Sequence, residues 1–127
     1  MVQQRGLSAI VGLSGHTDDV PSALRSLDIV VHASTEPEPF GMVIAEGMAA
    51  QRAVVAACGG GAAELFDDGR TALGYAPGDG EALAGRLAEL IQDRVGRDRL
   101  ASSARHAALD RFSPERMAAS FREVYAR

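Results

Sequence analysis

The sequence contains no lysine, so all 13 of its basic residues are arginines. The net charge is −4, which excludes the strongly basic surface that attracts nucleic acids or anionic membranes. The single cysteine, Cys58, can form no internal disulfide, and no Cys/His cluster has the spacing of a zinc site. The apolar runs are too short to cross a bilayer, and residues 1–7 lack the apolar core of a signal peptide. We therefore expect a cytoplasmic protein that binds neither nucleic acid nor metal.

Short β-type runs alternate with helical patterns along residues 1–76. The chain has 127 residues, 46% of them hydrophobic and 24% charged, which suits a single domain with one core. Four strands are predicted, at residues 7–13, 27–33, 53–57 and 71–75. The helices expected between them cover residues 20–26, 40–50 and 62–66. This alternation predicts an α/β fold with a parallel sheet and flanking helices.

The second part of the domain, residues 77–127, is predicted to be a helical tail. Its three helices are expected at residues 81–92, at residues 97–111 and from Pro114 onward. Ser113-Pro114-Glu115 is a typical helix start, because serine caps the helix, proline fits its first position and an acid suits its first turn. The apolar face of the last helix would consist of Met117, Phe121, Val124 and Tyr125.

The stretch T-E-P-E-P-F-G-M-V-I-A-E-G-M, residues 35–48, leads from the second predicted strand into a helix. Ligands of open parallel sheets bind beyond the carboxyl ends of the strands. A helix that starts there offers unpaired N–H groups and a partial positive charge, and Gly41 allows a ligand to approach the backbone. The stretch therefore predicts a phosphate seat. Two further loops, residues 14–19 and 58–64, are expected at the same edge of the sheet.

Two acids, Glu38 and Glu46, accompany the predicted phosphate seat. A carboxylate can accept two hydrogen bonds from the vicinal diol of a ribose or a hexose. Glu38 would meet a sugar on one side of the phosphates, and Glu46 would meet a ribose on the other. The alternative is that both are ordinary solvent-facing charges near a helix start. Glu36 falls outside the spacing and is interpreted as a loop charge, and no basic residue follows the motif before Arg52.

The segment E-P-F-G-M-V-I-A-E, residues 38–46, resembles the E-x(7)-E signature of retaining, nucleotide-sugar-dependent glycosyltransferases of the GT-B fold, the family 4 or "group 1" type. Four other segments resemble the same family in the same order. They are V-G-L-S-G-H-T-D-D-V (residues 11–20), L-D-I-V-V-H-A-S (27–34), V-V-A-A-C-G-G-G-A-A-E (54–64) and D-D-G-R-T-A-L-G-Y-A-P-G-D-G-E-A-L-A (67–84). The resemblance covers nearly the whole chain.

The resemblance implies a role for each matching residue. Glu38 would be the catalytic acid that faces the transferred sugar, and Glu46 would bind the ribose of the donor. Backbone amides at Phe40 and Gly41 would lie near the sugar, and those at Met42 and Val43 would bind the diphosphate. The other donor-binding residues implied by the match are Gly15, His16, Gly60, Gly61 and Glu64. The reaction would transfer a hexose to an unknown acceptor and would need neither a metal nor a cofactor.

Enzymes of the resembled family have two Rossmann-like domains, with the active site between them. This chain resembles only the later part of the second, C-terminal domain, the one that binds the donor. We expect the acceptor domain and the Arg/Lys pair that neutralises the diphosphate to be absent, so the chain alone would have no transferase activity. An acceptor bound to a membrane would place the complete enzyme at the inner face of that membrane.

The predicted strand order raises a question of stability. In a 3-2-1-4-5-6 sheet, the strand at residues 7–13 would be separated from its neighbours here by two absent strands. The gap would leave unpaired strand edges. We therefore expect marginal stability, or a dimer or rearranged strand that closes the gap.

Several departures from the family pattern leave alternatives open. Gln51-Arg52-Ala53 replaces x-G-x-P before a strand, Ala63 replaces a proline, and Gly47 replaces an alanine. The changes at Gln51 to Ala53 and at Ala63 favour, weakly, a non-catalytic nucleotide-binding or interaction module with a degenerate site. A nucleotide-sugar epimerase is a third interpretation, although its signature differs. From the residues alone, His32 is interpreted as a structural histidine, and residues 59–61 as either a simple turn or a ligand contact.

Overall fold

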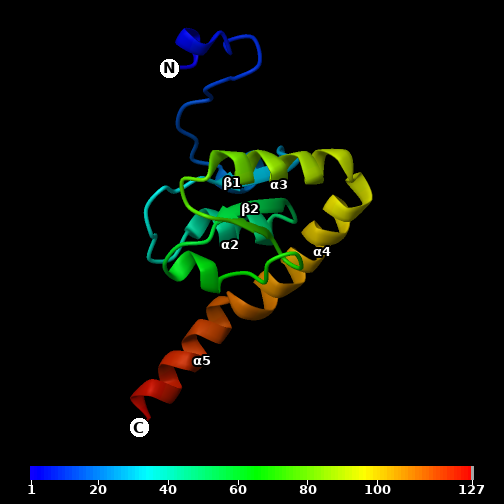
Figure 1. Cartoon of the computed structure of the whole chain (residues 1–127). Coiled ribbons are helices and arrows are strands. Elements are labelled where there is room, and N and C mark those ends of the chain that lie inside the picture. The colour runs from blue at the N-terminus through cyan, green and yellow to red at the C-terminus, as the bar shows by residue number, and fades with distance from the viewer. Residues whose placement is uncertain (127) are drawn as a thin grey trace.

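The computed structural model describes residues 1–126 and contains a small parallel sheet with helices on both sides (Figure 1). Its strands are β1 (Ile29–His32), β2 (Ala53–Ala57) and β3 (Leu73–Tyr75). The α-helices are α1 (Val20–Arg25), α2 (Met42–Ala49), α3 (Gly80–Gln92), α4 (Arg94–Arg111) and α5 (Pro114–Tyr125). Two short 3-10 helices complete the chain, at Gln3–Arg5 and Gly61–Glu64. The predicted α/β class with a parallel sheet is confirmed, and residues 62–66 contribute a 3-10 turn instead of an α-helix.

The three strands lie side by side in the order β1-β2-β3, and both pairings are parallel. The central strand β2 is buried at all five positions and consists only of alanine and valine. A continuous apolar run of this kind is typical of a strand that is covered on both faces. Two separate groups of core residues cover those faces, one on each side of β2.

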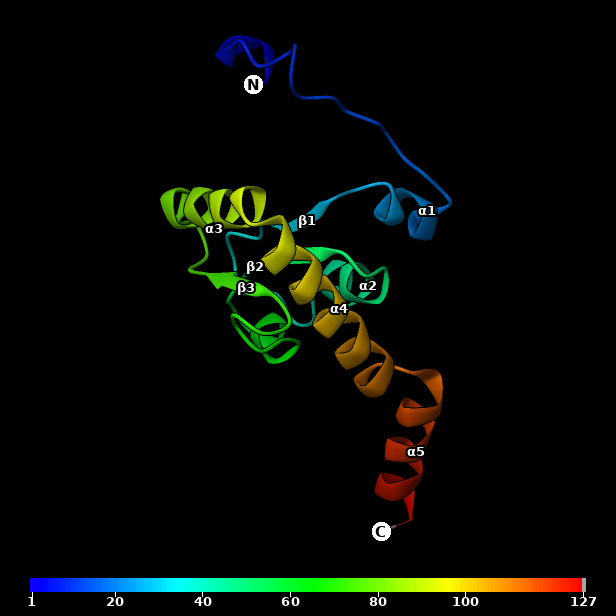
Figure 2. The same ribbon diagram turned by 90° about the vertical axis from the view of Figure 1, so that its right-hand side faces the viewer.

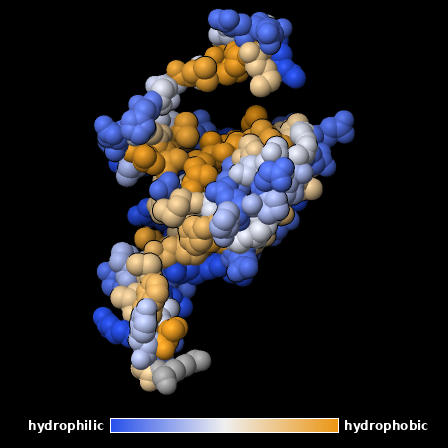
Figure 3. Space-filling model, turned by 90° about the vertical axis from the view of Figure 1, so that its left-hand side faces the viewer, coloured by the Kyte–Doolittle hydropathy of each residue, from blue (hydrophilic) through white to orange (hydrophobic). Residues whose placement is uncertain are grey.

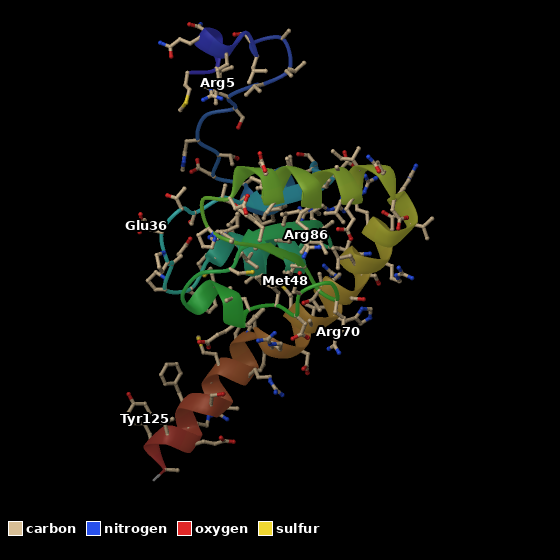
Figure 4. All side chains as sticks on the ribbon, in the orientation of Figure 1. Arg5, Glu36, Met48, Arg70, Arg86 and Tyr125 are labelled. Carbon is tan, nitrogen blue, oxygen red and sulfur yellow. The ribbon has the colours of Figure 1, made fainter. Side chains whose placement is uncertain are left out.

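On one face of the sheet, α2 and the later part of α4 pack against Val30 and Val54. Ile44 and Met48 of α2 are fully buried there, and Figure 4 places Met48 at the centre of the molecule. On the other face, α3 and the start of α4 pack against residues that include Val55. The start of α2 therefore lies at the edge of the sheet where β1 ends, as the sequence predicts.

Gly47 explains how closely α2 approaches the sheet. A Cβ atom at this position would lie 3.1 Å from Val54 Cγ2 and 3.2 Å from Val30 Cγ1. Both distances are tighter than ordinary van der Waals contact, so an alanine would require the two valines to move. The family that the sequence resembles usually has an alanine at this position. The close packing of α2 on β1 and β2 is a physical reason for the glycine found here.

The predicted strand at residues 7–13 is wrong. These residues form turns and irregular backbone, and all of them are exposed. Within the described chain, the hydrogen bonds of residues 1–18 reach no further than Asp19. Figures 1 and 2 show this N-terminal segment running away from the sheet. In the described chain the sheet consists of β1, β2 and β3 alone, and residues 7–13 pair with none of them.

The edge of the sheet at β1 is partly open. Val31 on this strand is 39% exposed, and the N-terminal segment carries the exposed apolar residues Ile10, Val11 and Leu13. Figure 3 shows apolar atoms along that segment and on the neighbouring part of the domain. The expectation of a dimer that closes this edge stays a prediction, because a single chain does not test it.

The helical tail follows the predicted boundaries closely. Helix α4 starts three residues earlier than expected because Asp93 caps it, its carboxylate accepting a hydrogen bond from the N–H of Gly96 at 2.8 Å. Helix α5 begins after Ser113 with Pro114 at its first position, as predicted. Its apolar face is exposed, and the helix projects from the domain (Figures 1 and 2). Within residues 1–126, none of the helices is both long and apolar enough to cross a membrane.

Candidate functional site

Two loops that the sequence singles out lie against each other at the carboxyl edge of the sheet. The first follows β1 and contains Glu38, and the second follows β2 and contains Gly60. Glu38 and Gly60 form an isolated parallel bridge, and the N–H of Ala62 donates to the carbonyl oxygen of Glu38 at 3.3 Å. The loop after β1, which leads into α2, is thus braced by the glycine-rich segment.

The glycines of that segment have a clear steric reason. A Cβ at Gly61 would lie 1.9 Å from the carbonyl oxygen of Pro39, and one at Gly60 would lie 2.6 Å from that of Glu38. Gly60 also has φ +63 and ψ −148, a conformation that L-residues with a side chain avoid. Close backbone contact therefore accounts for both glycines, and their contact with a ligand stays a prediction.

The N-terminus of α2 is open in a way that the other helices are not. In residues 1–126 the other four α-helices each begin with a side chain that accepts a hydrogen bond from the first turn; these caps are Asp19, Asp79, Asp93 and Ser113. Helix α2 begins instead at Gly41, with φ +86 and no side-chain cap. The N–H groups of Met42 and Val43 have no backbone acceptor in the described chain. This end of α2 can therefore receive an anion.

Glu38 stands directly before this helix end and is held by two neighbours. His32, the last residue of β1, contacts the Oε2 atom of Glu38 through Nε2 at 2.5 Å, and the hydroxyl of Ser34 donates to the same oxygen at 2.7 Å. These hydrogen bonds lower the pKa of Glu38 below its usual value, and the bond from His32 has the larger effect. Glu38 is therefore an ionised carboxylate at neutral pH.

Glu46 lies one turn further along α2 and is half-buried. It lines a groove of about 950 Å³ together with Phe40 and Met42, and Phe121 and Val124 of α5 also line this groove. The ring of Phe40 packs edge-on against Phe112, with centroids 6.4 Å apart. Glu46 therefore has a concave, largely apolar surface beside the open helix end.

The remaining predicted site residues, Gly15, His16 and Glu64, do not lie on α2 or in the loop before it. Gly15 and His16 lie in the exposed N-terminal segment, where His16 Nε2 is 3.1 Å from Asp18 Oδ1. Glu64 ends the 3-10 turn with an exposed side chain. Figure 4 shows Glu36 on the outer side of the loop, in agreement with its interpretation as a loop charge.

Sequence reasoning missed three residues that organise this edge: His32, Ser34 and Arg111. The side chain of Arg111, at the end of α4, donates to the carbonyl oxygens of Leu65 and Glu64 at 2.9 and 2.6 Å. No local pattern predicts this contact, because 46 or more residues separate the partners. A signal was present for His32, because it ends a predicted buried strand directly before the motif.

The protein is thus an α/β domain in which helix α2 has an open N-terminus. The ionised acid Glu38 precedes this helix, and the second acid, Glu46, lies within it. Comparison with known proteins gives the family. The family model described as "Glycosyl transferases group 1" matches residues 1–107. The chain therefore belongs to the group 1 glycosyltransferases, and its fold is that of their GT-B members.

The relatives are longer than this chain. The "Putative glycosyltransferase EpsD" of Bacillus subtilis (strain 168) is 30% identical over 126 residues, which cover 99% of this chain and 32% of the relative. The structure of Anabaena Alr3699/HepE in complex with UDP superposes with a TM-score of 0.95 at 34% identity, covering 98% of this chain and 34% of that one. The same protein in complex with UDP-glucose gives a TM-score of 0.93.

A third relative locates the match within a longer enzyme. The structure of the C-terminal domain of a glycosyl transferase group 1 family protein (LpcC) from Francisella tularensis has a TM-score of 0.77 at 30% identity, covering 89% of this chain and 59% of that one. This chain therefore spans 32 to 34% of the length of EpsD and HepE and is similar to part of the C-terminal domain of LpcC.

Proposed function

We propose that this chain forms the donor-binding part of a retaining glycosyltransferase that transfers a hexose from a nucleoside diphosphate sugar to an acceptor. The observation that carries the proposal is the uncapped N-terminus of α2, which lies between Glu38 and Glu46. Support also comes from HepE, which resembles this chain over 34% of its own length and whose crystal structures are complexes with UDP and with UDP-glucose. The acceptor-binding part would lie in sequence beyond this chain.

Each part of a nucleotide sugar has a counterpart in the proposed site. The N–H groups of Met42 and Val43 would bind the diphosphate, because they have no backbone acceptor and lie at the positive end of α2. Glu46 would accept hydrogen bonds from the ribose, and Glu38 from the hexose. Gly15 and His16 would lie beside the base, and the segment that holds Gly60, Gly61 and Glu64 would close the sugar side.

The reaction would break the bond between the anomeric carbon and the leaving phosphate oxygen. A bond from the acceptor oxygen would form on the same face, and the acceptor proton would pass to the leaving phosphate. No side chain of the site would act as a covalent nucleophile, since Glu38 is engaged by His32 and Ser34. The negative charge of the phosphate needs electrostatic stabilisation, and the cations for it would come from outside this chain. The isolated chain would accordingly be inactive.

The alternative of a degenerate, non-catalytic module receives little support from the geometry. The replaced segment Gln51-Arg52-Ala53 keeps the turn between α2 and β2, because Gln51 adopts the left-handed conformation, with φ 58. Ala53 is buried at the first position of β2. The departures thus leave the backbone that carries the two acids in place.

Calorimetric titration of the intact enzyme that carries this chain tests the proposal. UDP-, GDP- and ADP-glucose would be compared, and one of them is expected to bind. Glu46→Ala should lower the affinity for the nucleotide that binds by about tenfold or more, because one charge-assisted contact to the ribose is lost. Glu123→Ala, an exposed acid on α5, is the matched control and should leave binding unchanged. Absence of binding for all three would contradict the proposal.

A further inference from the structure

His32 is buried at the end of β1 although one of its ring nitrogens has no partner. Its side chain is 4% exposed and lies on the same face of the sheet as Val30 and α2. The backbone at this point is fixed from the far side of the sheet, because the hydroxyl of Tyr75 donates to the carbonyl oxygen of His32 at 3.2 Å. The imidazole is therefore held in one place by β1 and its neighbours.

The hydrogen bonds around Glu38 determine where the imidazole proton must be. An ionised carboxylate only accepts hydrogen bonds, so Nε2 of His32 is the donor to Oε2 of Glu38. Ser34 donates to the same oxygen. Within residues 1–126, the other oxygen, Oε1, receives no hydrogen bond. Two donors thus fix one carboxylate oxygen and leave the other available.

The second ring nitrogen argues against a purely structural histidine. Nδ1 is buried and has no hydrogen-bond partner in the described chain. Buried polar atoms in folded proteins almost always have partners, and a functional role is one of the reasons for an exception. A protonated Nδ1 would leave a buried donor unsatisfied, which is rarer than an unsatisfied acceptor. The arrangement therefore favours a neutral ring with its proton on Nε2.

We propose that His32 is a positioning residue for the sugar-facing acid: with its proton on Nε2, it acts with Ser34 to hold Oε2 of Glu38, so that Oε1 can accept a hydroxyl of the donor hexose. The inference rests on the proposed function, because it requires Glu38 to face the sugar. Its specific consequence is that His32 contributes to the affinity for the sugar and not to the affinity for the nucleotide.

Affinities for a nucleotide with and without its sugar separate these contributions. The dissociation constants of UDP and UDP-glucose would be measured for the intact enzyme, with GDP and ADP pairs if UDP does not bind. The sugar increment is the ratio of the two constants. His32→Leu should reduce this increment by about fivefold or more, because the leucine cannot donate, while the constant for the nucleotide alone stays unchanged. His32→Gln should keep most of it, because its amide can donate near the position of Nε2.

A double variant and a spectroscopic readout complete the test. Adding His32→Leu to Glu38→Ala should remove no further increment, because both changes act on the same contact. Equal loss in the nucleotide and nucleotide-sugar constants, or additive losses in the double variant, would overturn the inference. The ¹⁵N shifts of the imidazole, assigned by comparison with His32→Gln, should show the proton on Nε2 in the wild-type enzyme. A proton on Nδ1 would overturn the inference whether or not nucleotides bind, whereas failure of every nucleotide to bind with the proton on Nε2 would count only against the proposed function.

Discussion

Gly60 and Glu38 pair through their backbones, although 21 residues of chain, including all of α2, lie between them. The pairing joins the loop after β1 to the loop after β2 at the carboxyl edge of the sheet. The acid that we place opposite the donor sugar is therefore anchored at two levels. Its backbone is held by the glycine-rich segment, and its carboxylate is held by His32 and Ser34.

Gly61→Ala should destabilise the domain, because its new Cβ would collide with the carbonyl oxygen of Pro39, which is backbone and cannot rotate away. The loss in the free energy of unfolding is expected to exceed about 2 kcal/mol, at the upper end for overpacking. Urea denaturation followed by circular dichroism measures it. Gly85→Ala is the matched control: its Cβ would meet nothing within 4 Å in the middle of α3, so it should stabilise by up to about 1 kcal/mol. A Gly61→Ala variant as stable as the wild type would contradict this contact.

Glu38→Gln should change how stability depends on acid pH. The folded pKa of Glu38 is lowered, so its hydrogen bonds stabilise the fold fully at pH values above the unfolded pKa, about 4.3, and are lost as the pH falls through the lower folded pKa. The stability difference between wild type and Glu38→Gln should therefore shrink as the pH falls below about 4.3. Asp19 also has a lowered pKa, but it is common to both proteins and cancels. Urea unfolding across this range checks the prediction, and a constant difference would refute it.

Gln51→Gly should stabilise the domain, because Gln51 is the only residue other than glycine with a positive φ in the described chain. A left-handed conformation destabilises a residue with a side chain by about 1–2 kcal/mol, and glycine avoids this strain. Glycine also loses more conformational entropy on folding, which offsets about 0.5–1 kcal/mol of the gain. A net gain of about 0.5–1 kcal/mol in the free energy of unfolding is expected. Ala50→Gly, with φ −74 at the neighbouring position, should instead destabilise. Thermal and urea unfolding distinguish the two, and a loss of stability in Gln51→Gly would contradict the prediction.

The sequence predicted the elements that depend on local or repeating signals. The β-branched run of β1, the buried run of β2 and the Ser113-Pro114 helix start could be recognised because each is encoded within a few residues. The strand at residues 7–13 failed because its apolar pattern indicates strand propensity but not the presence of a partner strand. A strand forms only where a neighbouring edge accepts its hydrogen bonds.

The same distinction between local and long-range signals applies to the candidate site. The open start of α2 and the spacing of Glu38 and Glu46 could be predicted, because they lie in one continuous segment. The contacts of His32 and Arg111 could not be predicted, since they depend on how β1 and α4 meet the loops at the sheet edge. The glycines at 60 and 61 were recognised as special, but only the structure gives the backbone contact that requires them.

A crystal structure of the intact enzyme with its nucleoside diphosphate tests the central claim most directly. The account predicts diphosphate oxygens within hydrogen-bond distance of the N–H groups of Met42 and Val43, and ribose hydroxyls on the carboxylate of Glu46. A nucleotide bound elsewhere, with Glu46 facing solvent and the start of α2 empty, would contradict it.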